Sequence, residues 1–132
     1  MNYFLSKGLP KHIAAGIMGN LYVESRFNPS AIGDRGTSGG IAQWHGNRFT
    51  QLKMFAKKRN KDWRDLYTQL DFLLYELSSS YKNVYDKIRS VKDSDSVVNI
   101  WGHDYERFAG HTDFNNSNYK LRRKYAKYFN NL

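Results

Sequence analysis

One glycine-rich segment interrupts a chain in which apolar residues otherwise recur at helical spacing. From Asn28 to Gly46 the sequence reads NPSAIGDRGTSGGIAQWHG, and glycine, serine and aspartate favour turns over a continuous helix. Elsewhere, no useful length of sequence alternates with the two-residue period of a strand. The pattern predicts a mainly α fold of one domain, residues 1–132, with a loop or small β-hairpin at 28–46.

Six helices are expected from the periodicity and from capping residues. The first begins at Pro10, because proline is favoured at the first helical position, and it ends before Asn28. The other five are marked by apolar residues three and four apart. They are 47–59; a helix capped by Asp62 with Leu66, Leu70, Leu73 and Leu77; one with Val84, Ile88 and Val91; one capped by Ser94 or Asp95 with Val97, Val98, Trp101, Tyr105 and Phe108; and a basic last helix with Tyr125 and Phe129.

The charge balance constrains the partner. Lysine and arginine number 21 against 12 acidic residues, a net charge of +9, which favours a polyanion such as nucleic acid, anionic lipid or a cell wall. No helix-turn-helix or aromatic ribonucleoprotein motif accompanies the charge, so nucleic acid is not expected. No apolar run approaches the length for membrane insertion. The chain lacks cysteine and its four histidines lack zinc-site spacing, so neither a metal nor another cofactor is expected.

Glu24 is the most informative residue, because it lies on the apolar face of the first expected helix. At about 100° per residue from Ile13, Leu21 falls at about 80° and Glu24 at about 20°. An unpaired carboxylate on that face is costly. Burial therefore favours the neutral form and raises the pKa, as a general acid near neutral pH requires. The alternative is a structural glutamate paired with an arginine such as Arg26 or Arg48.

The residues around Glu24 resemble the phage tail lysozyme family. The stretch GIMGNLYVESRFNP at 16–29 is followed by Gly33 and Asp34, by GIAQW at 40–44, and by Arg48. More distantly, this looks like the E-S-x-F-N-P … G … G-x-x-Q pattern of goose-type lysozymes and soluble lytic transglycosylases. Weaker similarities follow at 70–77 (LDFLLYEL) and 105–107 (YER), and the resemblance extends over residues 8–128. Phe108 stands where the tail lysozymes tend to carry proline, which leaves the role of Glu106 open.

The resemblance implies a lysozyme-like helical domain whose glycine-rich segment forms the substrate groove. It implies that Glu24 is the catalytic acid, that Ser25 supports the helix end, and that Gln43 faces the bound sugar near the scissile bond. The substrate would be the glycan strand of peptidoglycan. The implied location is a phage tail tip in the virion, with other tail proteins as possible partners; a free secreted enzyme is the alternative.

Glycoside hydrolysis usually needs a second carboxyl group. Asp34 is the main candidate, because its loop can place it opposite Glu24 across a groove; alternatively it makes only a local turn. Asp71, Glu76 and Glu106 are the other acidic residues considered for this role. Glu76 is most simply explained as a structural charge paired with Arg107.

Several polar and aromatic residues are expected to contact the sugar or a water molecule. A glutamine amide offers a donor and an acceptor to an N-acetyl group, and aromatic rings offer stacking faces. Equally, hydroxyls in such a loop can stabilise turns, and the aromatic rings can belong to the core. The candidates are Gln43, Trp44, Thr37, Ser38, Tyr22, Tyr75 and Tyr105.

Three functions compete at this point. The first is a muramidase that hydrolyses the β-1,4 bond between N-acetylmuramic acid and N-acetylglucosamine. The second is a lytic transglycosylase, which cuts the same bond but leaves 1,6-anhydromuramic ends. The third is a non-catalytic basic module that binds the wall or nucleic acid, although such a module would gain nothing from an acid on an apolar helix face.

Overall fold

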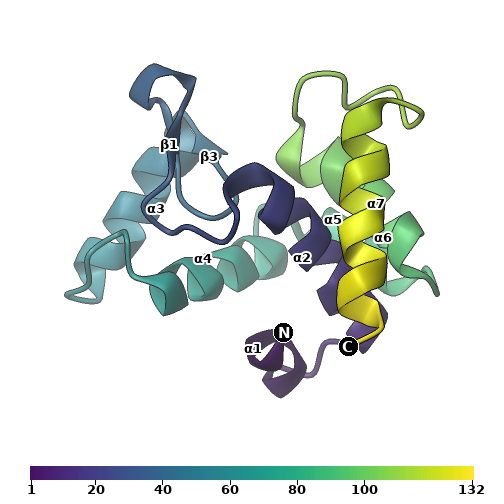
Figure 1. Cartoon of the computed structure of the whole chain (residues 1–132). Helices are drawn as coiled ribbons and strands as arrows, with labels where there is room; N and C mark the ends of the chain where they lie inside the picture. Colours follow the sequence, from purple (N-terminus) through teal and green to yellow (C-terminus); the bar gives the residue numbers. More distant parts are fainter.

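The chain folds into seven α-helices, two short helical turns and a small antiparallel sheet (Figure 1). The computed structural model describes residues 1–132. The predicted mainly α class is confirmed, with the sheet inside 28–46. None of the helices has the length and the apolar run that a membrane crossing would need. The helices are α1 (Asn2–Ser6), α2 (Lys11–Ser25), α3 (Asn47–Lys58), α4 (Leu66–Ser78), α5 (Lys82–Arg89), α6 (Ser94–Ile100) and α7 (Ser117–Asn130).

Helix α2 is the central element. Figure 1 shows the strands and α3 on one side of it, and α6 and α7 on the other. Its apolar face is fully buried, with Ile13, Ile17 and Leu21 each no more than 1% exposed. Burying one such side chain contributes about 1.5–3 kcal/mol. The orientation of α2 is therefore fixed, and its last turn is held between the two sides of the molecule.

The contact between α2 and α7 is close because Gly19 has no side chain. A Cβ on Gly19 would lie 2.5 Å from the carbonyl oxygen of Arg122 and 2.8 Å from the backbone nitrogen of Ala126. Any larger residue would push α7 outward. The glycine thus allows Arg122 to lie directly against the second half of α2.

The glycine-rich segment forms three two-residue strands, β1 (Ile32–Gly33), β2 (Ser38–Gly39) and β3 (Trp44–His45). They pair antiparallel in the order β1-β2-β3, with Ser38 opposite His45. Opposed residues project from the same face of a sheet. The hydroxyl of Ser25 donates to the carbonyl of Ile41 at 2.8 Å, so the end of α2 is tied to the sheet segment, in agreement with the support expected of Ser25.

Two helix caps differ from those expected. Asp65, and not Asp62, caps α4, and Asp93, in place of Ser94 or Asp95, caps α6. Each carboxylate accepts a hydrogen bond from the backbone N–H three residues on, at 2.9 and 2.8 Å. Both segments offer several capping residues within a few positions, so composition alone does not select among them.

Some helix limits also differ. The short helix α1 was not expected, and Pro10 is the extended residue before α2 (φ −57°, ψ 151°), not its first helical residue. Val91 lies beyond the end of α5. The single helix expected from Ser94 to Phe108 is instead α6 followed by η2 (Trp101–Glu106), a π-helical turn. Such turns are rare and often occur at functional sites.

Candidate active site

A cleft of about 630 Å³ opens at the end of α2. Residues of the sheet and of α3 line one part of it, and residues around the end of η2 line another. Three carboxylic residues from three different elements meet there. The lining residues are Glu24, Asp34, Gln43, His45, Arg48, Tyr81, Glu106, Arg107, Phe108 and Ala109.

Glu24 lies in the last turn of α2 with its side chain only 14% exposed. Its Oε1 accepts a hydrogen bond from Nη2 of Arg122 at 2.6 Å. Burial raises the pKa of Glu24; the charge and hydrogen bond of Arg122 oppose this, and the nearby charge of Asp34 adds to the rise. The net effect is a raised pKa of Glu24, which favours the protonated, neutral carboxyl group. The expected inward orientation is confirmed.

Arg122 holds this carboxyl group from α7. Its side chain is 2% exposed, Nη1 donates to Oδ1 of Asn20 at 2.9 Å, and Nε donates to Oδ1 of Asn118 at 2.7 Å. The guanidinium also lies 3.8 Å from the centre of the Phe108 ring. These contacts fix its position. Glu24 is thus paired with an arginine, as the alternative interpretation required, but the partner is Arg122 and not Arg26 or Arg48, because the end of α2 faces α7.

Arg122 was not predicted from the sequence, although a signal for it exists. Tyr119, Ala126 and Phe129 form the buried face of α7 at helical spacing, and Arg122 lies on that same face. As with Glu24, a charged residue on an apolar helix face predicts a buried charge that needs a partner. In α7 this residue is the counterion of Glu24.

Glu106 brings a second carboxyl group to the cleft. It is the last residue of η2 and accepts a hydrogen bond from the indole nitrogen of Trp101 at 3.1 Å. Burial raises its pKa well above the ordinary value, and the charge of Glu24 raises it further, while Arg122 and Arg48 oppose the rise. No cation contacts Glu106 directly. Simultaneous ionisation of both glutamates is therefore disfavoured.

Asp34 belongs to a small polar cluster at the sheet. Ser38 Oγ donates to its Oδ2 at 2.5 Å, and His45 Nδ1 lies 2.9 Å from the same hydroxyl and 3.5 Å from Oδ2. The side chains of Asp34 and His45 are both 67% exposed. His45 was not singled out from the sequence. Its pairing with Ser38 depends on the strand register, which short strands do not reveal.

Gln43 lines the cleft with part of its amide already used. Nε2 donates to the carbonyls of Ala31 and Gly40 at 3.2 and 2.9 Å. A Cβ on Gly33 would lie only 2.4 Å from Oε1 of Gln43, so this packing requires glycine at 33. Because both amide hydrogens are engaged within the loop, Gln43 can offer a ligand mainly an acceptor.

Two of the expected stacking residues lie in the core. Trp44 and Tyr105 are 1% and 0% exposed, and the Trp44 indole and the Tyr105 hydroxyl both donate to Oε1 of Glu76 at 2.8 and 2.5 Å. The prediction that these two rings stack on the sugar is therefore wrong, and both rings have a structural role in the core. Arg48 forms a bidentate pair with Glu76 at 2.8 and 2.9 Å. The expected pair of Glu76 with Arg107 is wrong, and Arg107 is exposed at the cleft.

The remaining candidates are dispersed. Thr37 is exposed and its hydroxyl donates to the carbonyl of Asp34 at 2.7 Å, whereas Ser38 is 1% exposed. Tyr22 is half-buried and packs on Tyr125 at 4.4 Å between ring centres. Tyr75 is 53% exposed but lies outside the Glu24 cleft, beside another hollow. The structure thus brings Glu24, Asp34 and Gln43 together, but not Tyr75.

The sequence matches the phage tail lysozyme family over residues 1–132, the whole chain, and the protein belongs to that family. No individually curated protein matches it. Family membership assigns the chain to the lysozyme-like enzymes that act on the cell wall, with peptidoglycan as the class of substrate. The family also associates the protein with phage.

Proposed function

We propose that the protein is a muramidase that hydrolyses the β-1,4 bond between N-acetylmuramic acid and N-acetylglucosamine, with Glu24 as the general acid. The supporting observation is a carboxyl group of raised pKa, 14% exposed, that opens into a cleft of about 630 Å³. A general acid needs this combination, because it must hold its proton at neutral pH and still reach the leaving oxygen. No metal or cofactor takes part in this scheme.

Glu24 protonates the glycosidic oxygen as the bond from the anomeric carbon to that oxygen breaks. The acid then becomes a carboxylate in a nearly buried position, where an unpaired charge is costly. Arg122, 2.6 Å away, stabilises this product of the transfer. The same arginine tends to remove the proton beforehand, and burial together with the charge of Asp34 offsets that tendency.

Glu106 helps to keep one proton on the carboxyl pair. Arg122 contacts Glu24 and not Glu106, so full ionisation of both would leave two negative charges beside one directly paired cation in a poorly solvated place. Like charges sharing a site raise the pKa of one member. We assign Glu106 this positioning role, acting through Glu24.

Asp34 is proposed to orient the attacking water. It lines the same cleft as Glu24, and Ser38 and His45 fix its carboxylate from the sheet side. A water held there attacks the anomeric carbon from the face opposite the leaving group and gives its proton to the Asp34 carboxylate, which acts as the base; this attack inverts the configuration of that carbon. Gln43 and Thr37 are proposed to contact the N-acetyl group and the water.

The biological setting is proposed as local wall penetration by a phage tail, with the enzyme in the virion and other tail proteins as neighbours. Family membership supports this setting. The net charge of +9 also suits an anionic wall, since it draws the enzyme to the polymer.

The variant Glu24→Gln tests the assignment. It removes the transferable proton but keeps the volume, so we expect loss of wall turbidity clearance by about 10²- to 10⁴-fold with an unchanged circular dichroism spectrum. A folded variant that cleaves at more than a few per cent of the parent rate contradicts the role. Mass spectrometry of the parent's products should find reducing muramic acid ends; fragments lighter by one water would identify a lytic transglycosylase.

A further inference from the structure

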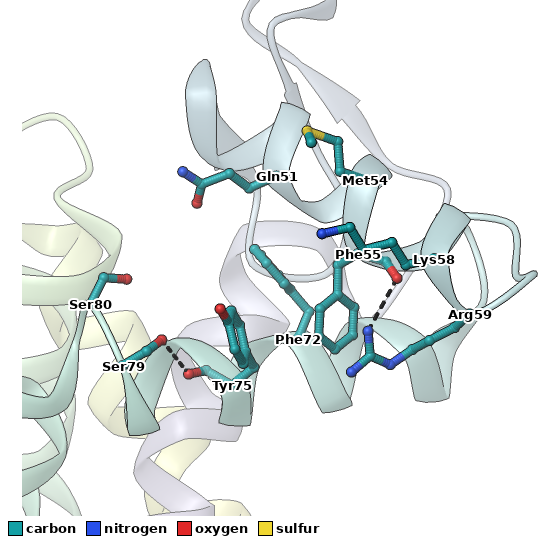
Figure 2. A pocket seen from close by; sticks show the side chains of 9 residues that line it. All are labelled: Gln51, Met54, Phe55, Lys58, Arg59, Phe72, Tyr75, Ser79 and Ser80. Carbon is teal, nitrogen blue, oxygen red and sulfur yellow. Dashed lines mark hydrogen bonds between the residues drawn. The ribbon is translucent and has the colours of Figure 1, made fainter.

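A second hollow, of about 440 Å³, lies between α3 and α4 (Figure 2). Figure 2 shows Gln51, Met54 and Lys58 projecting from α3, and Tyr75 from α4. Phe55 and Phe72, both mostly buried, form its apolar floor. We call it the Tyr75 pocket, lined by Gln51, Met54, Phe55, Lys58, Arg59, Phe72, Tyr75, Ser79 and Ser80.

The Tyr75 pocket adjoins the Glu24 cleft through a third hollow of about 380 Å³. Ser80 lines both the Tyr75 pocket and this middle hollow. Tyr81 and Arg107 line both the middle hollow and the Glu24 cleft. The three hollows therefore adjoin one another in this order, each sharing lining residues with the next.

The chemistry of the Tyr75 pocket suits an amphipathic, anionic ligand. Tyr75 is 53% exposed and Met54 54% exposed, so both large side chains are accessible to a ligand in the hollow. The Tyr75 ring is supported from behind by Phe55, at 5.5 Å between ring centres. A supported, accessible ring is a stacking platform. Lys58 and Arg59 are exposed cations at the rim, and neither forms an ion pair in the structure.

We propose that the Tyr75 pocket is a distal subsite of the Glu24 cleft, filled by a further sugar unit of the same glycan strand and by its anionic peptide stem. This inference rests on the proposed function. The sugar stacks on Tyr75, and carboxylates of the stem lie near Lys58 and Arg59. Binding energy gained far from the cut bond is used to position the bond at Glu24, so long strands are cut faster than short ones.

Tyr75→Ala tests the stacking contact, and Tyr67→Ala is the matched control. Tyr67 lies on the same helix, is 64% exposed and lines none of the three hollows. On long glycan strands we expect Tyr75→Ala to lower kcat/KM by about five- to tenfold, mainly through KM. On a tetrasaccharide too short to reach the pocket, the change should stay within about twofold. Tyr75→Phe keeps the ring and should retain the parent rate.

Lys58→Ala tests the charge contact, and the neighbouring Lys57→Ala is its control. Lys57 is exposed but lies outside the pocket. Lys58→Ala should weaken binding to strands that carry peptide stems about two- to fivefold. It should leave binding to strands stripped of their stems unchanged.

Binding is measured by calorimetry in a Glu24→Gln background, so the readout does not require cleavage. Unchanged strand binding by Tyr75→Ala overturns the inference and leaves the muramidase proposal intact. Equal losses on strands and tetrasaccharide also overturn it, because they place the effect at the cut bond. A parent protein that cleaves no wall overturns the proposed function, while the binding comparison still tests the pocket.

Discussion

Replacing Glu76 by glutamine should destabilise the protein strongly, even though the two side chains have the same shape. Glu76 is 3% exposed and receives four donors: two nitrogens of Arg48, the indole of Trp44 and the hydroxyl of Tyr105. A glutamine at this position has one acceptor oxygen and one NH₂ group. With its oxygen at the Oε1 position, the NH₂ would face the Nε donor of Arg48, and the Arg48 charge would lose its partner.

The size of the effect follows from this environment. Removing one partner of a buried ion pair lowers the free energy of unfolding by about 3–5 kcal/mol. Because Arg48 is 20% exposed at the cleft, water reduces the penalty, and we expect the lower figure of about 3 kcal/mol. For a chain of this length about 1 kcal/mol shifts the Tm by roughly 4 °C. The expected loss is therefore about 12 °C.

Thermal unfolding at pH 7, followed by circular dichroism, measures this loss. A double-mutant cycle with Arg48→Met isolates the pair, and we expect a coupling energy of about 2 kcal/mol or more, since the double variant has no unpaired charge. A loss below about 1 kcal/mol for Glu76→Gln would refute the reasoning. Strictly additive single losses would refute it as well, because the two groups would then act independently.

Two further variants probe the cleft itself. Glu106→Gln removes the second ionisable group of the carboxyl pair, so like-charge repulsion no longer retains the last proton of the pair, and the alkaline limb of the pH–rate profile should move to lower pH while the acid plateau is kept; an unmoved limb contradicts the positioning role. The same variant should also change the pH dependence of stability. A carboxyl group whose pKa is raised in the folded protein contributes stability below its unfolded pKa of about 4.3, and this contribution is lost as pH rises through the folded pKa. Urea unfolding should therefore find Glu106→Gln stabilised relative to the parent at pH 8 but not at pH 4. In the proposed mechanism Asp34→Asn should lower wall clearance less than Glu24→Gln does, because solvent can accept the proton of the attacking water in place of Asp34, whereas no other group protonates the leaving oxygen; a loss as complete as that of Glu24→Gln would mean that Asp34 is equally indispensable to the reaction.

The sequence predicts the inward face of α2 well, because helical geometry converts residue spacing directly into direction. Ile13 and Glu24 are therefore placed correctly relative to each other. The same rule does not say which element covers that face. The counterion Arg122 lies 98 residues from Glu24, and only the packing of α7 on α2 brings the two together.

Aromatic residues show a second limit. Trp44 and Tyr75 both occur in segments that resemble family motifs, and composition does not separate a ring in the core from one on the surface. Trp44 is buried because its indole can donate to Glu76, a partner 32 residues away. Tyr75 is one residue before that partner on α4, and its direction differs by about 100°, which turns it outward to the Tyr75 pocket.

The electrostatics of the acid depend on how closely two helices approach. Arg122 both lowers the pKa of Glu24 and stabilises the carboxylate that Glu24 becomes, and the strength of either effect falls with distance. That distance is set at Gly19, where a side chain would clash with the backbone of α7. If α7 moved outward, Glu24 would hold its proton more firmly but would leave an unpaired carboxylate on giving it up. Under the proposed mechanism Gly19 therefore influences how well Glu24 acts as the general acid, although Gly19 lies outside the cleft.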